Sequence, residues 1–591
     1  MKKLIVGICL LFFTIFLLNS CKKDFLERYP LDRISNTTFW NTENDLKIYN
    51  NGLYNMAGDD VNVPIMMGHH EGFDSHWSGI WYLDEYSDNI APNIARHAFF
   101  SQTRSGKHNV PSTPQQYGWR GWNFVRAINV GLDNYNKANV PSQTLDKYAA
   151  EARLFRGWFY ADKVSKFGDV PWVGHELNID SKELYALRTP REQAMDSVMA
   201  DLTFACVKLP ASWGDGNAPG RLSRWAALLV KSRVCLFEGT WRKYHGGKNP
   251  DMWLKEAADA AKELMDKGPY TLYSSGDPLH DYNAYHRATD LTGNKEVIYW
   301  RKYQLGVITN HVMSYHVGYN GGATKSMVED YLCTDGLPVS LSPLYKGDAQ
   351  IENVFINRDP RLRQTILHTA DQAYYNYDRS LAYTYPRVTG MAGGQIGTTG
   401  YHIIKAYESV AAGNAYNTST TPAITLRLGE ALLNYAEAKA ELSTLTQADL
   451  DISINKLRDR VGMIHMNISS IPVDPRYVSD AVSPLIVEIR RERRVELFME
   501  GFRYDDLRRW KQGKKLEIPS MGILWDAAAI ARFPLATVKT SVDPVSGKTY
   551  INVYKGTDWD NPVFDESKHY LWPIPLSALS QNPELKQNPN W

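Results

Sequence analysis

The chain is 591 residues long and carries 66 Lys and Arg against 65 Asp and Glu, a formal charge of +1 at pH 7. This balance excludes the basic footprint of a nucleic-acid-binding protein, and the length exceeds what one hydrophobic core supports, so we expect packed subdomains. Beyond residue 21 the cysteines are Cys206, Cys235 and Cys333, which form neither a disulfide framework nor a zinc set.

The start of the chain has the pattern of a bacterial lipoprotein signal. Two lysines follow Met1, an apolar run covers residues 4–18, and Cys21 comes after small and polar residues. The run is shorter than the roughly 20 residues that a membrane-spanning helix needs. We therefore predict a signal peptide over residues 1–20, lipidation of Cys21 and a tether over residues 21–41. A cleaved secretory peptide with an incidental cysteine, or an uncleaved N-terminal anchor, would begin in a similar way.

Apolar residues at helical spacing predict that helices dominate the rest of the chain. The expected helices span residues 122–138, 145–167, 190–209, 223–239, 252–266, 424–442, 452–461 and 483–500. For the third of these, Thr189 is the expected cap, Pro190 the first helical residue and Glu192 the second partner of a capping box. Residues 295–300 predict a short strand.

The early helices come in pairs with short turns, which is typical of degenerate tetratricopeptide-like repeats. Residues 270–420 and 511–570 have few helical periods, and residues 370–421 have no strong period at all. A loop of that length in a compact domain is usually functional or mobile. The predicted fold class is mainly α, with tetratricopeptide-like helical repeats and an irregular, loop-rich subdomain packed on them.

A charged run extends from Glu488 to Arg509, with seven arginines nearly balanced by six acidic residues. Glu488, Glu492, Glu496 and Glu500 recur at four-residue steps, so they share a helix face and would repel one another without arginines beside them. The run predicts a structural lattice of salt bridges between packed helices, and not a nucleic-acid site.

Three motifs of catalytic or metal chemistry are incomplete. His69, His70, Glu71 and His76 invite a metal-site interpretation, but zincin spacing would need histidine where Asp74 stands. Residues 546–549 end like a phosphate loop, but Val542 replaces the required glycine. No Gly-x-Ser-x-Gly elbow is present. We predict no metal, no cofactor and no catalytic residues, although a glycosidase acid pair among the many carboxylates stays open.

Several motifs follow one another along almost the whole chain. They are residues 21–30 (CKKDFLERYP), 151–160 (EARLFRGWFY), 167–171 (FGDVP), 326–336 (SMVEDYLCTDG), 358–362 (RDPRL), 426–428 and 434–438 (LRL, NYAEA), 491–497 and 501–510 (RERRVEL, GFRYDDLRRW), 571–575 (LWPIP) and 587–589 (QNP). In this order they resemble the SusD/RagB family of surface nutrient-binding lipoproteins. Each motif alone is modest, and their common order is specific.

The resemblance implies a helical region over residues 42–269 and a C-terminal region over residues 270–591, which holds variable ligand-binding loops and the final helical repeats. It implies a non-catalytic lipoprotein on the surface of the outer membrane, held there by its N-terminal lipid. It also implies a partner, a SusC-like TonB-dependent outer-membrane barrel over which the lipoprotein sits as a lid. The cargo in the family is usually a glycan, and some relatives take peptides.

Aromatic side chains in two loop regions, residues 69–100 and 300–320, are the candidates for ligand contact. Sugars pack their C–H faces on rings and need polar partners beside them, and both regions offer this mixture. In the family these two regions commonly supply the sugar-facing aromatics, a correspondence of regions and not of single residues. For any single ring, packing in the core is the competing interpretation. The predicted ligand-binding residues are Trp77, Trp81, Asn93, Arg96, Trp300, Tyr303, His311, Tyr315 and Tyr319.

The function predicted from the sequence is capture of an oligosaccharide and its delivery to the barrel transporter without chemistry. Three alternatives stay open. The cargo could be a peptide or another nutrient, the protein could be a surface glycoside hydrolase, or it could be a structural scaffold for the transporter.

Overall fold

The structure is a computed structural model that describes residues 38–57, 64–71, 79–93, 98–114, 118–312, 321–370, 374–375, 382–383, 386–391, 397–407 and 418–591. Cys21 and the predicted signal and tether lie outside these ranges. Within them, no helix combines the length and the apolar character that crossing a membrane requires.

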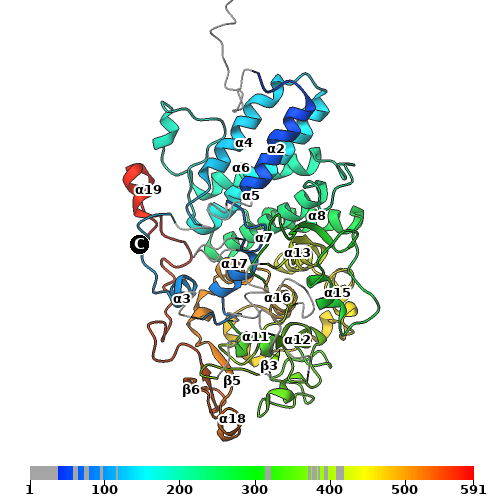
Figure 1. The fold of residues 1–591 in the computed structure, drawn as a ribbon, viewed down its shortest axis with the longest axis vertical. Coiled ribbons are helices and arrows are strands. Elements are labelled where there is room, and N and C mark those ends of the chain that lie inside the picture. The colour runs from blue at the N-terminus through cyan, green and yellow to red at the C-terminus, as the bar shows by residue number, and fades with distance from the viewer. Residues whose placement is uncertain are drawn as a thin grey trace, which may run out of the picture.

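Long helices form the upper and middle parts of the molecule in Figure 1. Helix α5 packs against α6, α7 packs against α8, and α8 in turn contacts α13. Gly157 lets α5 and α6 approach, because a Cβ there would lie 3.0 Å from Leu202, and Gly239 does the same for α7 against Leu254 at 2.8 Å. The helices are α2 (Glu43–Ala57), α3 (Ala98–Ser105), α4 (Trp122–Asn134), α5 (Ser142–Phe167), α6 (Arg191–Lys208), α7 (Arg224–His245) and α8 (Pro250–Lys267).

The second half of the chain adds shorter helices and three small sheets. Strand β1 pairs with β4, β2 with β3, and β5, β7 and β6 form an antiparallel sheet that lies with α18 at the lower end of Figure 1. The helices are α9 (Asp281–His286), α11 (Lys325–Asp330), α12 (Pro360–Thr365), α13 (Leu428–Glu441), α14 (Gln447–Asp451), α15 (Ile454–Arg460), α16 (Pro484–Glu496), α17 (Arg503–Arg509), α18 (Ala527–Arg532) and α19 (Leu576–Gln581). The strands are β1 (Val297–Arg301), β2 (Tyr374–Tyr375), β3 (Ala382–Tyr383), β4 (Ala423–Arg427), β5 (Met521–Leu524), β6 (Thr540–Val542) and β7 (Thr549–Asn552).

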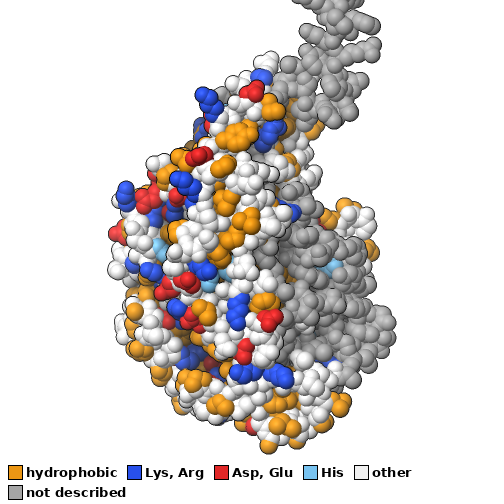
Figure 2. Space-filling model, turned by 90° about the vertical axis from the view of Figure 1, so that its left-hand side faces the viewer, with side chains coloured by type: hydrophobic (Ala, Val, Ile, Leu, Met, Phe, Trp, Pro, Cys, Tyr) orange, Lys and Arg blue, Asp and Glu red, His pale blue; other side chains and the backbone are white. Residues whose placement is uncertain are grey.

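Helices therefore dominate and strands are few, which confirms the predicted mainly α fold class. One large apolar core contains residues from Trp40 to Leu585 and so draws on both halves of the chain. The division into regions 42–269 and 270–591 stays a prediction. On the face shown in Figure 2, acidic and basic side chains of the described residues are interspersed, as the near-neutral charge leads us to expect.

The helix expected over residues 424–442 is partly wrong. Residues Ala423–Arg427 form strand β4, and the helix begins only at Leu428. Strand β4 pairs antiparallel with β1, with Ile424 opposite Trp300. The β-branched Ile424 and Thr425 suit a pleated strand, and the cross-strand partner, distant in sequence, decides the outcome.

The capping box expected at Thr189 is also wrong. Thr189 exchanges backbone hydrogen bonds with Val170, and its hydroxyl accepts from the backbone N–H of Trp172 at 3.2 Å. Helix α6 starts at Arg191, whose N–H donates to Asp169 at 2.7 Å. A carboxylate from a preceding loop thus satisfies one of the free N–H groups in the first turn of the helix.

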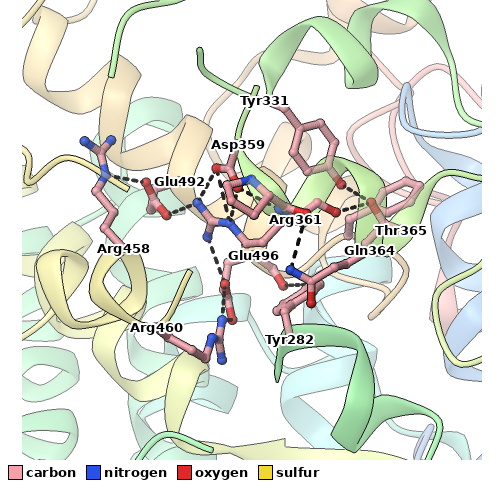
Figure 3. A network of polar contacts seen from close by, with 12 residues as sticks. Tyr282, Tyr331, Asp359, Arg361, Gln364, Thr365, Arg458, Arg460, Glu492 and Glu496 are labelled. Carbon is pink, nitrogen blue, oxygen red and sulfur yellow. Dashed lines mark hydrogen bonds and ion pairs between the residues drawn. The ribbon is translucent and has the colours of Figure 1, made fainter. Parts of the chain in front are cut away.

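The predicted salt-bridge lattice is confirmed and centres on α16 (Figure 3). Arg361 on α12 forms ion pairs with Asp359 at 2.7 Å, Glu492 at 2.6 Å and Glu496 at 2.9 Å. Glu496 also pairs with Arg427 at 2.8 Å and Arg460 at 2.7 Å. All of these side chains are buried, so each charge depends on its partners for the solvation that water would otherwise provide.

Helix α16 ends at Glu496 rather than at residue 500. Met499 and Gly501 both adopt positive φ angles, 64° and 81°, which breaks the helical path. Glu500 leaves the helix face and forms ion pairs with Lys405 at 2.6 Å and Arg427 at 2.8 Å.

A few buried titratable groups have strongly shifted pKa values. Burial raises the pKa of Asp84 to about 7, against the opposing effect of a hydrogen bond from the backbone of Met499. Burial lowers the pKa of His108 to about 3 and that of His569 to about 4. The two imidazole rings lie 5.2 Å apart, so a positive charge on either further disfavours a charge on the other.

The end of the chain returns to the N-terminal helices. The backbone N–H of Trp572 donates to Lys166 O at 2.6 Å, at the last turn of α5. Asn588 donates to Phe167 O at 3.0 Å and accepts from Arg188 at 2.7 Å. These contacts close the C-terminal end of α5.

Candidate ligand-binding site

The two predicted loop regions meet on the β1–β4 pair. Strand β1 leads directly into the second region, and residues 64–71 of the described chain run beside β4, where the Thr425 hydroxyl donates to Met67 O at 2.7 Å. The N–H of Ile80 donates to Gly68 O at 2.9 Å and thereby joins the two sides of residues 72–78, which lie outside the described ranges. The pair of strands is thus the rigid base of the site.

A carboxylate, a guanidinium and a phenol tie this base together. Arg301 donates to both carboxylate oxygens of Glu71, with Nη2 3.0 Å from Oε2, and Tyr303 donates to Oε1 at 2.8 Å. The backbone N–H of His69 donates to the Tyr303 hydroxyl at 2.8 Å. Burial, and then the nearby charge of Glu71, raise the pKa of Tyr303 well above its usual value. Tyr303 therefore stays a neutral donor.

Rings gather next to this group. The His69 ring stacks on Tyr303 at 6.1 Å between centroids and lies edge-on to Trp81 at 6.2 Å. The His70 and His311 rings are 4.6 Å apart, and the N–H of His311 donates to His70 O at 3.0 Å. Trp81 and Tyr303 therefore lie beside His69, and His311 lies beside His70, although these residues come from two separate loop regions of the sequence.

Two glycines make this arrangement possible. A Cβ on Gly68 would lie 2.7 Å from both Arg301 and Tyr303. Gly79 has a φ angle of 117°, and a Cβ there would lie 2.4 Å from the backbone N of His70. Any other residue at position 79 would displace the backbone of His69 and His70.

The predicted residues have different positions in the structure. Trp81, Tyr303 and His311 are buried at 6%, 3% and 1% exposure and form part of the base. Trp300 is equally buried but packs elsewhere, with Tyr285 and other apolar side chains. Asn93 is half-buried. Contact of these residues with a ligand stays a prediction; Trp77, Arg96, Tyr315 and Tyr319 lie outside the described residues.

Sequence reasoning missed the structural pair of Glu71 and Arg301 and the contacts that Asn310 makes. Asn310 exchanges backbone hydrogen bonds with Ser419 and donates from its amide to Thr421 O at 2.8 Å, which connects the second loop region to the chain before β4. Partners more than a hundred residues apart give no local signal. The one usable hint was that Glu71 lies inside the first aromatic region, and Arg301 and Tyr303 inside the second.

The arrangement is suited to binding more than to acid–base chemistry, since both oxygens of Glu71 are already occupied by Arg301. Among the described residues, no group of three or more His, Cys, Asp or Glu side chains could hold a metal ion.

Comparisons with known proteins agree on one class: mainly helical outer-membrane-associated proteins of the SusD type. The description "SusD family" matches residues 286–591, more than half of the chain, and the description "Starch-binding associating with outer membrane" matches residues 24–236. The chain belongs to the SusD family.

Relatives cover most of the chain at low identity. SusD-like protein P2 of Formosa agariphila is 24% identical over 80% of this chain and 79% of its own length, and a SusD-like protein of Bacteroides ovatus is 22% identical over 84% and 81%. Among solved structures, a SusD-like carbohydrate-binding protein of Bacteroides fragilis superposes with a TM-score of 0.71 at 23% identity, covering 93% of this chain and all of that one. A laminarin-binding SusD-like protein superposes with a TM-score of 0.56 at 18% identity, again over 93% and 100%. These structural likenesses establish the shared fold.

Proposed function

We propose that this protein binds glycans at the cell surface and delivers them to a SusC-like TonB-dependent barrel for import, without performing chemistry. The observation that carries the proposal is the convergence of two aromatic loop regions on one rigid base in a chain of the SusD family. Two of the solved SusD-like structures are described as carbohydrate-binding and laminarin-binding.

The base suits this task because it is pre-organised. Glu71, Arg301 and Tyr303 hold one another, so the segments that begin after Glu71 and after Val312 start from fixed points. A preformed frame with apolar rings and a few polar groups lowers the entropic cost of binding. Trp77, Asn93, Arg96, Tyr315 and Tyr319 are the proposed ligand contacts. Trp81, Tyr303 and His311 are buried in the base and would support these contacts, whereas Trp300 packs elsewhere.

Lipidation at Cys21 would hold the protein on the outer membrane beside its transporter. The family description of outer-membrane association supports this location. The lipoprotein pattern at the start of the chain supplies the anchor, and the partner barrel follows from the family resemblance. Metabolic labelling with a fatty-acid analogue, lost in C21A, tests the anchor directly.

The binding test is calorimetry of residues 22–591 against a panel of glycans and peptides. W77A and Y315A are expected to weaken glycan binding about tenfold or more, because aromatic stacking and buried apolar area are lost. Y185A is the matched control, since Tyr185 is 61% exposed and lies in the segment before α6, outside the site. W81A and W300A are poorer tests because both rings are buried and their removal costs stability.

The outcomes separate the alternatives. A glycan that binds the wild type and Y185A equally, but not W77A or Y315A, supports the proposal. Peptide binding with all glycans silent refutes the sugar assignment and favours peptide import. New reducing ends after incubation with a polysaccharide would refute the statement that no chemistry is performed.

A further inference from the structure

A cavity lies between α9 and α12, and none of its lining residues belongs to the candidate ligand-binding site. Its volume is about 790 Å³, within the range of about 300–1,000 Å³ that small-ligand sites occupy. Phe355, Leu362 and Ile404 form its apolar walls, and Asn283 and Gln364 add amide groups. Gln364 and Asp359 are both labelled in Figure 3, where Asp359 pairs with Arg361. The cavity thus borders the buried lattice and shares Asp359 with it.

The lining has more positive than negative charge. Arg287, Arg358 and Arg363 all line the cavity, whereas Asp359 is the one carboxylate among the lining residues. Asp359 is already neutralised by Arg361, whose Nη2 lies 2.7 Å from it. Arg363 engages other groups as well, so the excess of positive charge rests on Arg287 and Arg358.

These two arginines act at different depths. Arg358 is 5% exposed, and its guanidinium donates to the backbone oxygens of Val354, Val328 and Tyr331 at 2.6–2.9 Å, with no carboxylate of the described chain in its shell. Arg358 is therefore a positive charge held in a fixed position in the wall of the cavity. Arg287 is exposed at the mouth and forms no ion pair with any described residue. A ligand in the cavity would meet Arg287 directly and feel the field of Arg358.

We propose that this cavity binds an anionic sugar unit, one that carries a carboxylate or a sulfate group. Arginine is the side chain best matched to planar or tetrahedral oxyanions, because its fork of donors makes paired charge-assisted hydrogen bonds. The apolar walls accommodate the C–H face of the sugar, and Oδ1 of Asn283, which has no hydrogen-bond partner among the described residues, offers an acceptor to a hydroxyl. The Gln364 amide is already bound to Asn283, Pro278 and Pro360. The saccharide part of this inference rests on the proposed function, and the anionic part rests on the cavity.

The test uses the full chain in detergent and two pairs of matched probes. Oligogalacturonate is compared with its methyl ester, and a sulfated galactan oligosaccharide with its desulfated form, by calorimetry at low and at moderate salt. We expect the charged member of at least one pair to bind tighter than its neutral counterpart, more so at low salt. The pair that responds identifies carboxylate or sulfate as the recognised group.

The variants locate the effect. R287Q is expected to reduce the affinity for the charged probe about tenfold, the value of one charge-assisted hydrogen bond, and R287K to retain part of it. R126Q removes one exposed positive charge from α4 and is expected to change nothing.

Equal affinity for charged and neutral probes, or equal effects of R287Q and R126Q, would overturn the inference. In that case neutral binding that is lost in W77A would leave the proposed function standing. Silence of every saccharide, charged or neutral, would refute both.

Discussion

Neutralising Glu496 should destabilise the protein far more than neutralising a surface carboxylate. Glu496 is fully buried and lies 2.7–2.9 Å from guanidinium nitrogens of Arg361, Arg427 and Arg460. The attraction of these arginines holds its pKa far below the usual value, despite the opposing effect of burial. In E496Q the three guanidinium groups keep their burial but lose a shared counter-charge, and such a loss costs about 3–5 kcal/mol.

We expect the lower end of that range, about 3 kcal/mol, because the amide oxygen of glutamine still accepts a hydrogen bond. With an unfolding entropy of about 2.1 cal/mol/K per residue, 591 residues give about 1.2 kcal/mol/K, so the midpoint falls by only about 2–3 °C. Chemical denaturation followed by circular dichroism is therefore the better assay, with calorimetry as a check.

The matched control is E176Q. Glu176 pairs with Arg126 at 2.8 Å, but Arg126 is 61% exposed, and such surface pairs contribute about 0–1 kcal/mol. Because the folded pKa of Glu496 is lowered, its contribution is present above its unfolded pKa of about 4.5 and is lost as pH falls below it. An E496Q variant within about 0.5 kcal/mol of both wild type and E176Q at pH 7 would show that the lattice does not depend on this charge.

The other predictions concern the base of the site and two sets of buried titratable groups. G79A should lower the free energy of unfolding by about 1–3 kcal/mol and weaken ligand binding, because the new Cβ would collide with the backbone at a φ angle of 117°. The control G52A, on α2 with open space around it, should be neutral or slightly stabilising. Equal stability of the two variants in denaturation would contradict the strain argument. Asp84, with its pKa raised to about 7, destabilises the fold as pH rises from about 4 to 7, so D84N should gain stability relative to wild type across that window in pH-dependent melting, and a constant difference would refute this. His108 and His569 have lowered pKa values, so the stability they permit is lost as pH falls from about 6.5 towards 4; the double variant H108Q/H569Q should show a shallower acid dependence, and an unchanged slope would speak against these histidines.

Local and periodic patterns were readable from the sequence, and long-range partners were not. The charged run around Glu492 and Glu496 predicted a lattice because seven positive and six negative charges within residues 488–509 can be buried only in pairs. The identity of the partners, such as Arg361 and Arg427, needed the fold. The same limit explains Ile424, whose apolar neighbours fit a helix until a distant strand, β1, supplied its hydrogen bonds.

The candidate site was predictable as two regions and not as a geometry. Aromatic content marked both loops, and the structure brings Trp81, Tyr303 and His311 of these loops together. The Glu71–Arg301 pair that organises them joins residues 230 positions apart, so spacing could not reveal it. Trp300 shows a further limit: the face of a strand that a ring occupies depends on the register with the partner strand, and Trp300 packs in the cluster of Tyr285 instead.

The contacts of Trp572 and Asn588 with the end of α5 have a consequence for the order in which the molecule can form. A ribosome makes the N-terminal helices first, and the segment that completes their packing is made about four hundred residues later. Until Trp572 and Asn588 have been made, the backbone oxygens of Lys166 and Phe167 lack the hydrogen bonds that these residues donate, and the Phe167 ring lacks its contact with Trp572. The packing at the end of α5 is therefore complete only after residues 572–588 have been made. Deleting these residues would remove contacts from a region that lies four hundred positions away in sequence.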